Sequence, residues 1–526
     1  MPKENNKMQV DIDTLKKQNV NDLLSIKELY KRIEELGEKI TQVKYIDNTL
    51  IKKIKKEYGN FKKIILDENV QVKLTNDIKT INSQLTNEIV NTNALFRLVN
   101  DSINIDINNI STFKNAITNN LLKITFWGDS ITEGWDYITD NMLYYNIYVN
   151  EIKKAFPTVN IIVNNRGIGG AMIENAIDDN YISGTNFTKT WSTETGKSWK
   201  QYVKDTAPDL LFVAFGMNAQ NNDTLGSNAV KSLIDFANSF EKKPTIIFLT
   251  NFLPRESWIA TTSTGAYSKR IEAQRYTRNI VSDYTKDINT DNITTISTKD
   301  KTYNVTLFDI GDVYNKLYLG YSDLKTSVKA YRNGVDFNHP ELLVKSTEYN
   351  LLSNSYNFEL RCKLNYSNST NNTFGVTCRN GLTILINSNG SIGIYKGSTL
   401  LRQRTRKPFM STDLKIKVID DLIEIWLGDY IQLRHYSNDC VANGRIYMAI
   451  DGAKIAVNNL IVINHEPIKG KSVITEDFAC GDYSNKTIET KYPYGGNGVN
   501  HPTSNLVELL YTPFIKKFIN IIKTNF

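Results

Sequence analysis

Histidine and cysteine are both scarce in this chain. Its 526 residues include 4 histidines and 4 cysteines. The cysteines are Cys362, Cys378, Cys440 and Cys480. None belongs to a CxxC pair, so we expect no zinc site, no other bound metal and no cofactor, whereas a disulfide between two of them stays open. A histidine that serves as a general base has to be one of the 4 in the chain.

Long apolar runs and a strong charge imbalance are also absent. No run reaches the roughly 18 apolar residues of a membrane-spanning helix, so we expect no membrane span. The residues Met1 to Asn6 are polar, and we therefore expect no Sec-type signal peptide. The net charge is +7, and lysine and arginine are mixed with acidic residues, which disfavours nucleic-acid binding. The length and the 40% share of hydrophobic residues predict about three or four globular units.

The first 115 residues carry apolar side chains at steps of three and four. The clearest run is Ile26, Leu29, Ile33, Leu36, Ile40 and Val43. Such spacing is typical of a coiled coil, so residues 1–115 are predicted to form a helical oligomerisation segment. The mixture of isoleucine and leucine is compatible with two, three or four strands. A helical hairpin within one chain, broken near Gly59, is the alternative.

From Leu121 the pattern changes to short apolar runs that alternate with amphipathic segments. The apolar runs are 124–127, 159–164, 209–215, 245–250 and 305–310. The amphipathic segments are 142–156, 229–240 and 270–285. This alternation predicts a parallel sheet covered by helices on both faces, which is a three-layer α/β domain. We assign residues 116–340 to the first part of this domain.

Between residues 341 and 485 the apolar period becomes two. Phe358, Leu360, Cys362 and Leu364, for example, alternate with polar residues. Asn-Gly and Asp-Gly pairs separate many of these runs. The pattern predicts an inserted antiparallel β-sandwich of concanavalin-like or jelly-roll type.

Residues 486–526 are predicted to return to the α/β domain. A final amphipathic helix is expected from Asn505 to about Ile522, with Thr503 or Ser504 as its N-cap. A single helix after a sandwich has no other obvious surface on which to bury its apolar face. We therefore expect it to complete the α/β domain.

Three polar motifs follow three of the predicted strands. They are Gly128-Asp129-Ser130, the loop that ends in Gly169-Gly170, and Gly216-Met217-Asn218. Because parallel strands end at the same edge of a sheet, we expect the three motifs to converge in one crevice. There Ser130 would be a nucleophile, while the backbone N–H groups of Ser130 and Gly170 and the amide of Asn218 would bind an oxyanion. The alternative is that Ser130 only caps the helix that follows it.

These motifs, in this order, resemble those of the SGNH or GDSL-like hydrolases. The resemblance covers about residues 121–317 and the C-terminal helix region. It implies that Ser130 is the nucleophile, that Gly170 and Asn218 complete the oxyanion hole, and that a late histidine is the base. One departure is Ala219, which stands where the family often has aspartate. That difference concerns the geometry of the loop rather than the chemistry.

Two histidines compete for the role of base, since His435 and His465 lie on strand-like stretches and are expected to be structural. Asp336 and His339 match the family's Asp-x-x-His pattern, in which the aspartate orients the imidazole. His501 has Gly498 at the corresponding position, but the predicted terminal helix follows it at once, as it follows the family's histidine.

We favour His501 over His339 as the base on this ground. Asp336 would then reach His501 across the two ends of the insertion, or a backbone carbonyl would hold the imidazole. The reverse assignment makes Asp336 and His339 the working pair.

The resemblance implies an ester hydrolase, and acetyl groups on carbohydrate are frequent substrates of the family. With the coiled coil and the sandwich, it suggests a trimeric phage tail or receptor-binding protein. Such a protein would sit on the virion with other tail proteins and deacylate a polysaccharide or teichoic-acid-like glycan of the host surface. Two alternatives stay open: a free bacterial esterase for glycan or lipid, and a host-adhesion protein whose hydrolase site has decayed.

Overall fold

The computed structural model of the chain describes the following residues: 94–105, 107, 110–134, 140–220, 223–255, 266–284, 304–319, 321–330, 349–355, 357–366, 372–378, 381–437, 444–451, 455–469, 474–480, 496 and 499–524. By contacts, the chain divides into two units, Met1–Ser102 and Ile103–Phe526. Most of the predicted coiled coil lies outside the described residues, as do Asp336, His339 and Gly498. The α/β domain and the antiparallel sheets belong to the second unit. No described helix is long and apolar enough to cross a bilayer.

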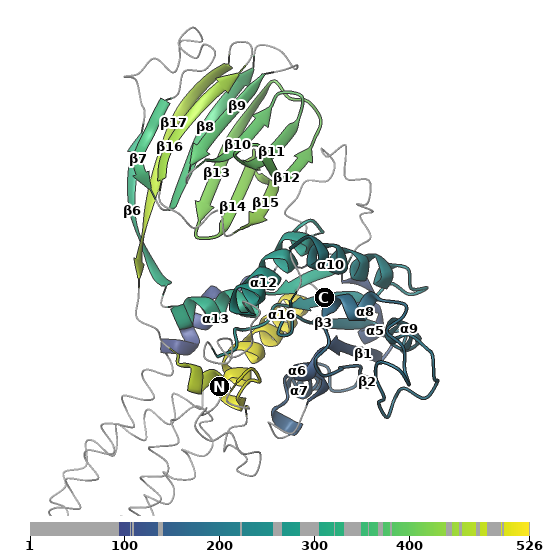
Figure 1. The fold of residues 1–526 in the computed structure, drawn as a ribbon. Helices are drawn as coiled ribbons and strands as arrows, with labels where there is room; N and C mark the ends of the chain where they lie inside the picture. The colour runs from purple at the N-terminus through teal and green to yellow at the C-terminus, as the bar shows by residue number, and fades with distance from the viewer. Residues whose placement is uncertain are drawn as a thin grey trace, which may run out of the picture. The chain divides into compact units, whose positions relative to one another are not determined.

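A five-stranded parallel sheet forms the centre of the α/β domain (Figure 1). Its strands are β1 (Leu121–Gly128), β2 (Asn160–Asn165), β3 (Leu210–Ala214), β4 (Thr245–Leu249) and β5 (Val305–Phe308). Their order is β2-β1-β3-β4-β5, and every neighbouring pair is parallel. The predicted parallel sheet is confirmed, and the chain reverses its direction of winding between β2 and β3.

Helices pack on both faces of this sheet because the apolar strands have no polar side. Phe126 and Trp127 are adjacent in β1 and therefore point to opposite faces. Trp127 packs with buried residues of α8 (Ile173–Ile177), α9 (Trp199–Asp205), α10 (Asp223–Asn238) and α12 (Ala266–Ser282). Phe126 stacks on Phe212 and contacts Tyr144 of α7 (Tyr144–Ala155). Trp127 is thus a core residue of the α/β domain.

The C-terminal helix packs on the same sheet, as its sequence predicts. It runs through α15 (Ser504–Leu506), a π-helical turn labelled η4 (Val507–Tyr511) and α16 (Thr512–Thr524). Thr503 is the N-cap, and its hydroxyl accepts a hydrogen bond of 3.1 Å from the Leu506 N–H. The rings of Phe514 and Phe518 lie 5.5 and 5.7 Å from that of Phe308 in β5. The last helix therefore belongs to the α/β domain.

The remaining strands form two six-stranded antiparallel sheets, with the orders β12-β11-β10-β9-β16-β7 and β15-β14-β13-β8-β17-β6. The strands are β6 (Tyr321–Ala330), β7 (Tyr349–Ser355), β8 (Asn357–Tyr366), β9 (Thr373–Cys378), β10 (Leu382–Asn387), β11 (Ser391–Lys396), β12 (Thr399–Thr405), β13 (Ser411–Ile419), β14 (Leu422–Leu427), β15 (Tyr430–Tyr436), β16 (Gly444–Asp451) and β17 (Ile455–Lys469). One apolar core joins them, to which the alternating residues of β8, β10 and β13 contribute. The predicted antiparallel sheets are confirmed.

Strand β6 is a correction to the predicted boundary of the sandwich. It follows α13 (Ile310–Leu319) and lies before residue 341, yet it pairs with β17 along its length. It is the last strand of its sheet, and edge strands are often polar, so its sequence lacks a clear apolar alternation. The described cysteines Cys362, Cys378 and Cys480 are all buried.

Candidate active site

The first motif lies where β1 turns into the short helix α6 (Ser130–Glu133). A Cβ on Gly128 would lie 2.4 Å from the Ala214 carbonyl oxygen, so this turn requires glycine. Asp129, not Ser130, caps the helix, because its carboxylate accepts a 3.0 Å hydrogen bond from the Ile131 N–H. The interpretation of Ser130 as an N-cap is therefore wrong. Ser130 is the first residue of α6 and is buried.

Asp129 links the first motif to the third. Burial raises the pKa of its carboxyl to about 7, against the lowering influence of the Ile131 and Met217 N–H groups and of the Arg270 charge. The Met217 peptide N–H thus points at the residue that precedes Ser130. The buried Asp129 carboxyl, whose pKa is raised toward neutrality, thus joins the segments that follow β1 and β3.

The second motif is packed tightly against α6. A Cβ on Gly167 would lie 2.2 Å from the Glu133 backbone nitrogen, so the loop can approach this closely only with glycine there. The Glu133 carboxylate accepts a 2.5 Å hydrogen bond from the Gly169 N–H. Asn165 bridges the two segments, since its amide donates to the Thr132 carbonyl at 2.6 Å. The loop that carries Gly170 is therefore fixed relative to Ser130.

Gly170 itself presents an open backbone. Its φ is +74°, and a Cβ at this position would meet no atom within 4 Å. The positive φ favours glycine and turns the peptide away from the course of a strand. Gly170 thus exposes its peptide group beside α6, and an oxyanion donor has to be exposed in this way.

The third motif brings Asn218 to the second. Gly216 has a φ of +125°, and a Cβ there would lie 2.2 Å from the Asn251 side-chain oxygen. The chain turns at this point, and the Asn218 amide donates a 3.3 Å hydrogen bond to the Ala171 carbonyl. Ala171 is the neighbour of Gly170, so the structure places both proposed oxyanion donors side by side. An amide carries two N–H groups, and this bond uses one of them.

His501 lies in a loop that contacts the segment following β4. The Arg255 N–H donates to the Val499 carbonyl at 2.8 Å. His501 is 7% exposed, and burial lowers the pKa of its imidazole to about 4. The ring is therefore neutral at physiological pH, which is the state that a general base requires.

One partner of the His501 imidazole is the side chain of Asn500. His501 Nδ1 lies 2.9 Å from the Asn500 side-chain oxygen, and Asn500 is also buried. With its proton on Nδ1, His501 donates to that oxygen and its Nε2 is the basic nitrogen. The sequence pattern indicates no role for Asn500, since the orienting group was expected at Asp336 or at a backbone carbonyl. Its position next to His501 is the one signal the sequence offers.

The segment after His501 also reaches the first motif. A small cavity at the carboxyl ends of β1, β3 and β4 is lined by Asp129, Tyr144, Thr250 and Tyr511, among others. Tyr511 lies in the helix that begins three residues after His501, and its ring centroid is 5.3 Å from that of Tyr144. The structure thus brings Ser130, Gly170 and Asn218 to one edge of the sheet, and the helix that follows His501 packs against the first motif there.

Two further histidines lie on strands of the sandwich, as the sequence predicts, and no metal site is apparent in the described parts. His435 lies in β15 and His465 in β17. Burial lowers the pKa of His435 to about 3 and also lowers that of His465. Within the described ranges, no group of three metal-ligating side chains occurs.

We expect the Asp129 carboxyl to make stability depend on pH in an unusual direction. Its folded pKa lies above the ordinary value, so the folded protein keeps a proton that the unfolded chain loses. Relative to Asp129→Asn, the wild-type free energy of unfolding should fall by up to about 4 kcal/mol as the pH rises from 4 to 7. Urea unfolding of both proteins at each pH measures this difference, and a constant difference would contradict the assignment.

No family model matches the chain, and no curated protein sequence matches it. Several solved structures are similar. A two-domain esterase active on acetylated mannans has 12% identity and a TM-score of 0.23, over 69% of this chain and 98% of the esterase. An acetyl xylan esterase variant from Geobacillus stearothermophilus has 16% identity and a TM-score of 0.22, over 37% and 79% of the two chains.

The sandwich also has a similar solved structure. A carbohydrate-binding module from Bacillus subtilis has 11% identity and a TM-score of 0.16, over 24% of this chain and 78% of the module. All these identities and TM-scores are low. The function therefore has to be inferred from the site itself.

Proposed function

We propose that the protein is a serine ester hydrolase of SGNH type that removes acetyl or similar acyl groups from a glycan. One observation carries the proposal. The loops that follow three strands hold Ser130, Gly170 and Asn218 at one edge of the sheet. In the C-terminal segment, the buried His501 forms a hydrogen bond through Nδ1 with the side-chain oxygen of Asn500. This is the set of groups that acyl transfer requires.

The reaction would follow from these groups. His501 Nε2 takes the proton of the Ser130 hydroxyl, and Oγ attacks the acyl carbonyl carbon. The oxyanion accepts hydrogen bonds from the Ser130 and Gly170 backbone N–H groups and from the Asn218 amide. The sugar hydroxyl leaves with the proton from His501, and water, activated by the same imidazole, then cleaves the acyl-enzyme and releases the acid.

The glycan substrate is proposed from the domain arrangement. An inserted antiparallel sandwich beside an esterase site suits a carbohydrate that one domain binds while the other deacylates it. The heptad-like N-terminal segment supports a role in a trimeric phage tail or receptor-binding protein at the host surface. In such an assembly, repeated weak glycan sites would add up to firm attachment.

Adhesion without catalysis is the second candidate function. The observation that favours it is the contact between the Asn500 amide and His501 Nδ1. Hydrolases of this kind commonly have a carboxylate at that position. An amide orients the ring but stabilises an imidazolium less than a carboxylate does. If the chain only binds glycan, the three motifs would be remnants of an ancestral site.

A fluorophosphonate probe distinguishes the two candidates. The Ser130 Oγ displaces fluoride from the phosphorus atom only if the base and the oxyanion hole work. We expect one label per chain on Ser130, together with turnover of 4-nitrophenyl acetate and release of acetate from an acetylated glycan. Intact-mass and peptide mass spectrometry measure the label. A wild-type protein with neither label nor turnover would favour adhesion.

A further inference from the structure

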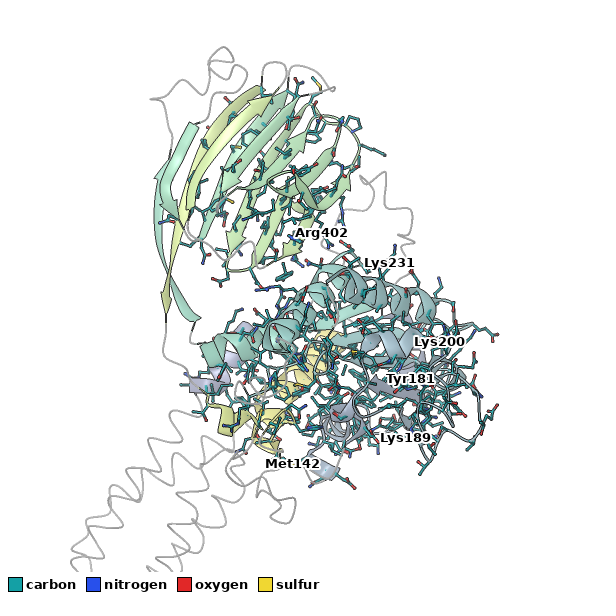
Figure 2. The ribbon with its side chains drawn as sticks, in the orientation of Figure 1. Met142, Tyr181, Lys189, Lys200, Lys231 and Arg402 are labelled. Atoms are coloured by element: carbon teal, nitrogen blue, oxygen red, sulfur yellow. The ribbon has the colours of Figure 1, made fainter. Side chains whose placement is uncertain are left out.

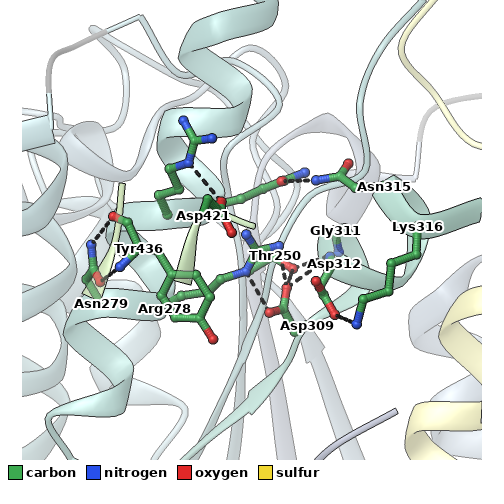
Figure 3. Close-up of polar contacts among 12 residues, drawn as sticks. Thr250, Arg278, Asn279, Asp309, Gly311, Asp312, Asn315, Lys316, Asp421 and Tyr436 are labelled. Atoms are coloured by element: carbon green, nitrogen blue, oxygen red, sulfur yellow. Dashed lines mark hydrogen bonds and ion pairs between the residues drawn. The ribbon is translucent and has the colours of Figure 1, made fainter. Parts of the chain in front are cut away.

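Helix α12 carries polar contacts on two of its faces. Arg270, Gln274 and Arg278 recur at steps of four and contact loops of the α/β domain. Arg275 and Asn279 lie on another face and contact the sandwich. In Figure 3, Arg278 binds Asp309 and also lies over the ring of Tyr436, whose backbone Asn279 binds from the same helix. One rigid element therefore touches both the candidate active site and the inserted domain.

Arg270 holds the third motif of the active site. It is 3% exposed, and its Nε donates a 2.7 Å hydrogen bond to the Met217 carbonyl. That carbonyl belongs to the peptide that joins Met217 to Asn218. On the other side of Met217, its N–H points to the Asp129 carboxyl. The backbone just before Asn218 is thus fixed from two sides by buried charged or polar groups.

The middle of α12 is anchored to the ends of β4 and β5. The Gln274 amide donates to the Asn251 carbonyl at 2.7 Å. Arg278 forms a bidentate pair with Asp309, at 2.6 and 2.9 Å, and Arg278 is buried. The Asp309 carboxylate also accepts a 2.8 Å hydrogen bond from the Thr250 hydroxyl. These contacts fix the axis of the helix against the sheet.

The sandwich clamps the last turns of α12 and the residues that follow. Arg275 forms a 2.9 Å ion pair with Asp421. The Asn279 side chain binds the backbone of Tyr436 twice, as donor to the carbonyl at 3.0 Å and as acceptor from the N–H at 2.7 Å. Asp283, just after the helix, accepts from two sandwich arginines. They are Arg402 at 2.5 Å and Arg404 at 2.6 Å.

The two sandwich arginines of this clamp are largely shielded from water, whereas Asp283 is 26% exposed. Arg404 has a side-chain exposure of 3% and Arg402 one of 15%. Removing one partner from a buried pair leaves the other charge uncompensated, so such pairs resist rearrangement. Figure 2 labels Arg402 at the edge of the sandwich. The sandwich therefore contacts α12 and Asp283 through side chains that would lose their hydrogen-bond and ion-pair partners if the two moved apart.

We propose that Arg270 is a positioning residue for the oxyanion donor Asn218, and that the sandwich, by clamping α12 at Asp283, Asn279 and Arg275, helps to hold Arg270 in place. The inserted domain is then a structural part of the catalytic unit as well as a binding module. The inference rests on the proposed ester hydrolase function. It predicts that changes in the sandwich clamp alter the hydrolysis of a substrate too small to reach the sandwich.

A double-mutant cycle tests the part played by Arg270. We expect Arg270→Gln to lower kcat for 4-nitrophenyl acetate by about 10- to 100-fold with little change in KM, because an oxyanion contact acts in the transition state. In an Asn218→Ala background, the same substitution should cost less than about threefold, since the donor that it positions is already gone. Arg270→Lys, which keeps the charge, covers the case in which the glutamine variant does not fold. Lys269→Gln, at the neighbouring surface position, is the control.

The sandwich clamp is tested in the same assay. Asp283→Asn should lower kcat by about three- to tenfold, and this loss should shrink when Arg270 is already glutamine. Arg361→Gln, which removes an ion pair within β8, should leave kcat unchanged. Additive effects of Arg270→Gln and Asn218→Ala would overturn the positioning role, and full activity of Asp283→Asn would overturn the role of the sandwich. If the wild-type protein neither turns over ester nor takes the fluorophosphonate label, the proposed function and this inference both fail.

Discussion

Replacing Ser130 by alanine should abolish ester hydrolysis, with a loss of about 10⁴-fold or more in kcat for 4-nitrophenyl acetate. The hydroxyl is the one group that becomes covalently bonded to the acyl carbon, so no other side chain can substitute for it. What remains should be the weak activity of an oxyanion hole that polarises the ester toward water. The substitution removes a single oxygen atom from a buried position, and the fold should tolerate it.

A matched control separates chemistry from folding. Ser183 is 1% exposed and belongs to the same domain, where its hydroxyl donates to the Glu194 carbonyl. Ser183→Ala should keep kcat within about threefold of wild type, while urea unfolding reports the cost of the lost hydrogen bond. If Ser130→Ala retained the wild-type rate, Ser130 would not be the nucleophile and the catalytic mechanism proposed here would be wrong.

The sheet of the α/β domain could be predicted from sequence because most of its strands are buried on both faces. A strand such as β4 (TIIFL) is then an uninterrupted apolar run with all its residues buried, and the helices between the runs are amphipathic. The three motifs could be placed together for a topological reason. Parallel strands end at one edge, so residues that follow β1, β2 and β3 meet without any knowledge of side-chain positions.

The limits of prediction are equally physical. Edge strand β6 is polar and lacks a clear alternation of apolar residues. Its sequence therefore does not predict the pairing with β17. Arg270 reaches the Met217 carbonyl from a helix more than fifty positions further along the chain, at 2.7 Å. Contacts of this kind depend on how α12 packs against α10 and β5. No spacing rule indicates which arginine of the helix faces the site.

Asn500 shows a further limit. Its oxygen lies 2.9 Å from His501 Nδ1, yet adjacent residues on an irregular loop have no fixed relative orientation. The family pattern directs attention to the position three residues before the histidine, which is Gly498 here. In the structure, the side chain that contacts His501 Nδ1 belongs to its neighbour in the chain, Asn500.

His501→Ala should lower kcat by about 10³- to 10⁴-fold, because the serine hydroxyl then has no base to accept its proton. His339→Ala should change kcat by less than about threefold if His501 is the base. The opposite ranking would assign the role to the Asp336 and His339 pair. Rates of 4-nitrophenyl acetate hydrolysis in the two variants, with unfolding midpoints measured alongside, decide between the histidines.

The pH dependence of kcat/KM identifies the base more directly than loss of activity does. Burial lowers the pKa of His501 to about 4, and protonation of the ring removes the base. Activity should therefore decline only as the pH falls toward 4, well below the ordinary value near 6.5 for an exposed histidine. A wild-type acid limb near pH 6.5 would point to a more exposed histidine.

The pH dependence of an Asn500→Asp variant tests the contact between Asn500 and His501 directly. A carboxylate on Nδ1 stabilises the imidazolium, so it should raise the pKa of His501 and move the acid limb of kcat/KM to higher pH by roughly one unit or more. The same charge should keep or increase kcat at pH 8, since the imidazolium that forms in the transition state gains a partner. Asn500→Ala should lower kcat without moving the limb upward. An acid limb that stays in place in Asn500→Asp would mean that His501 is not the group whose protonation controls the reaction.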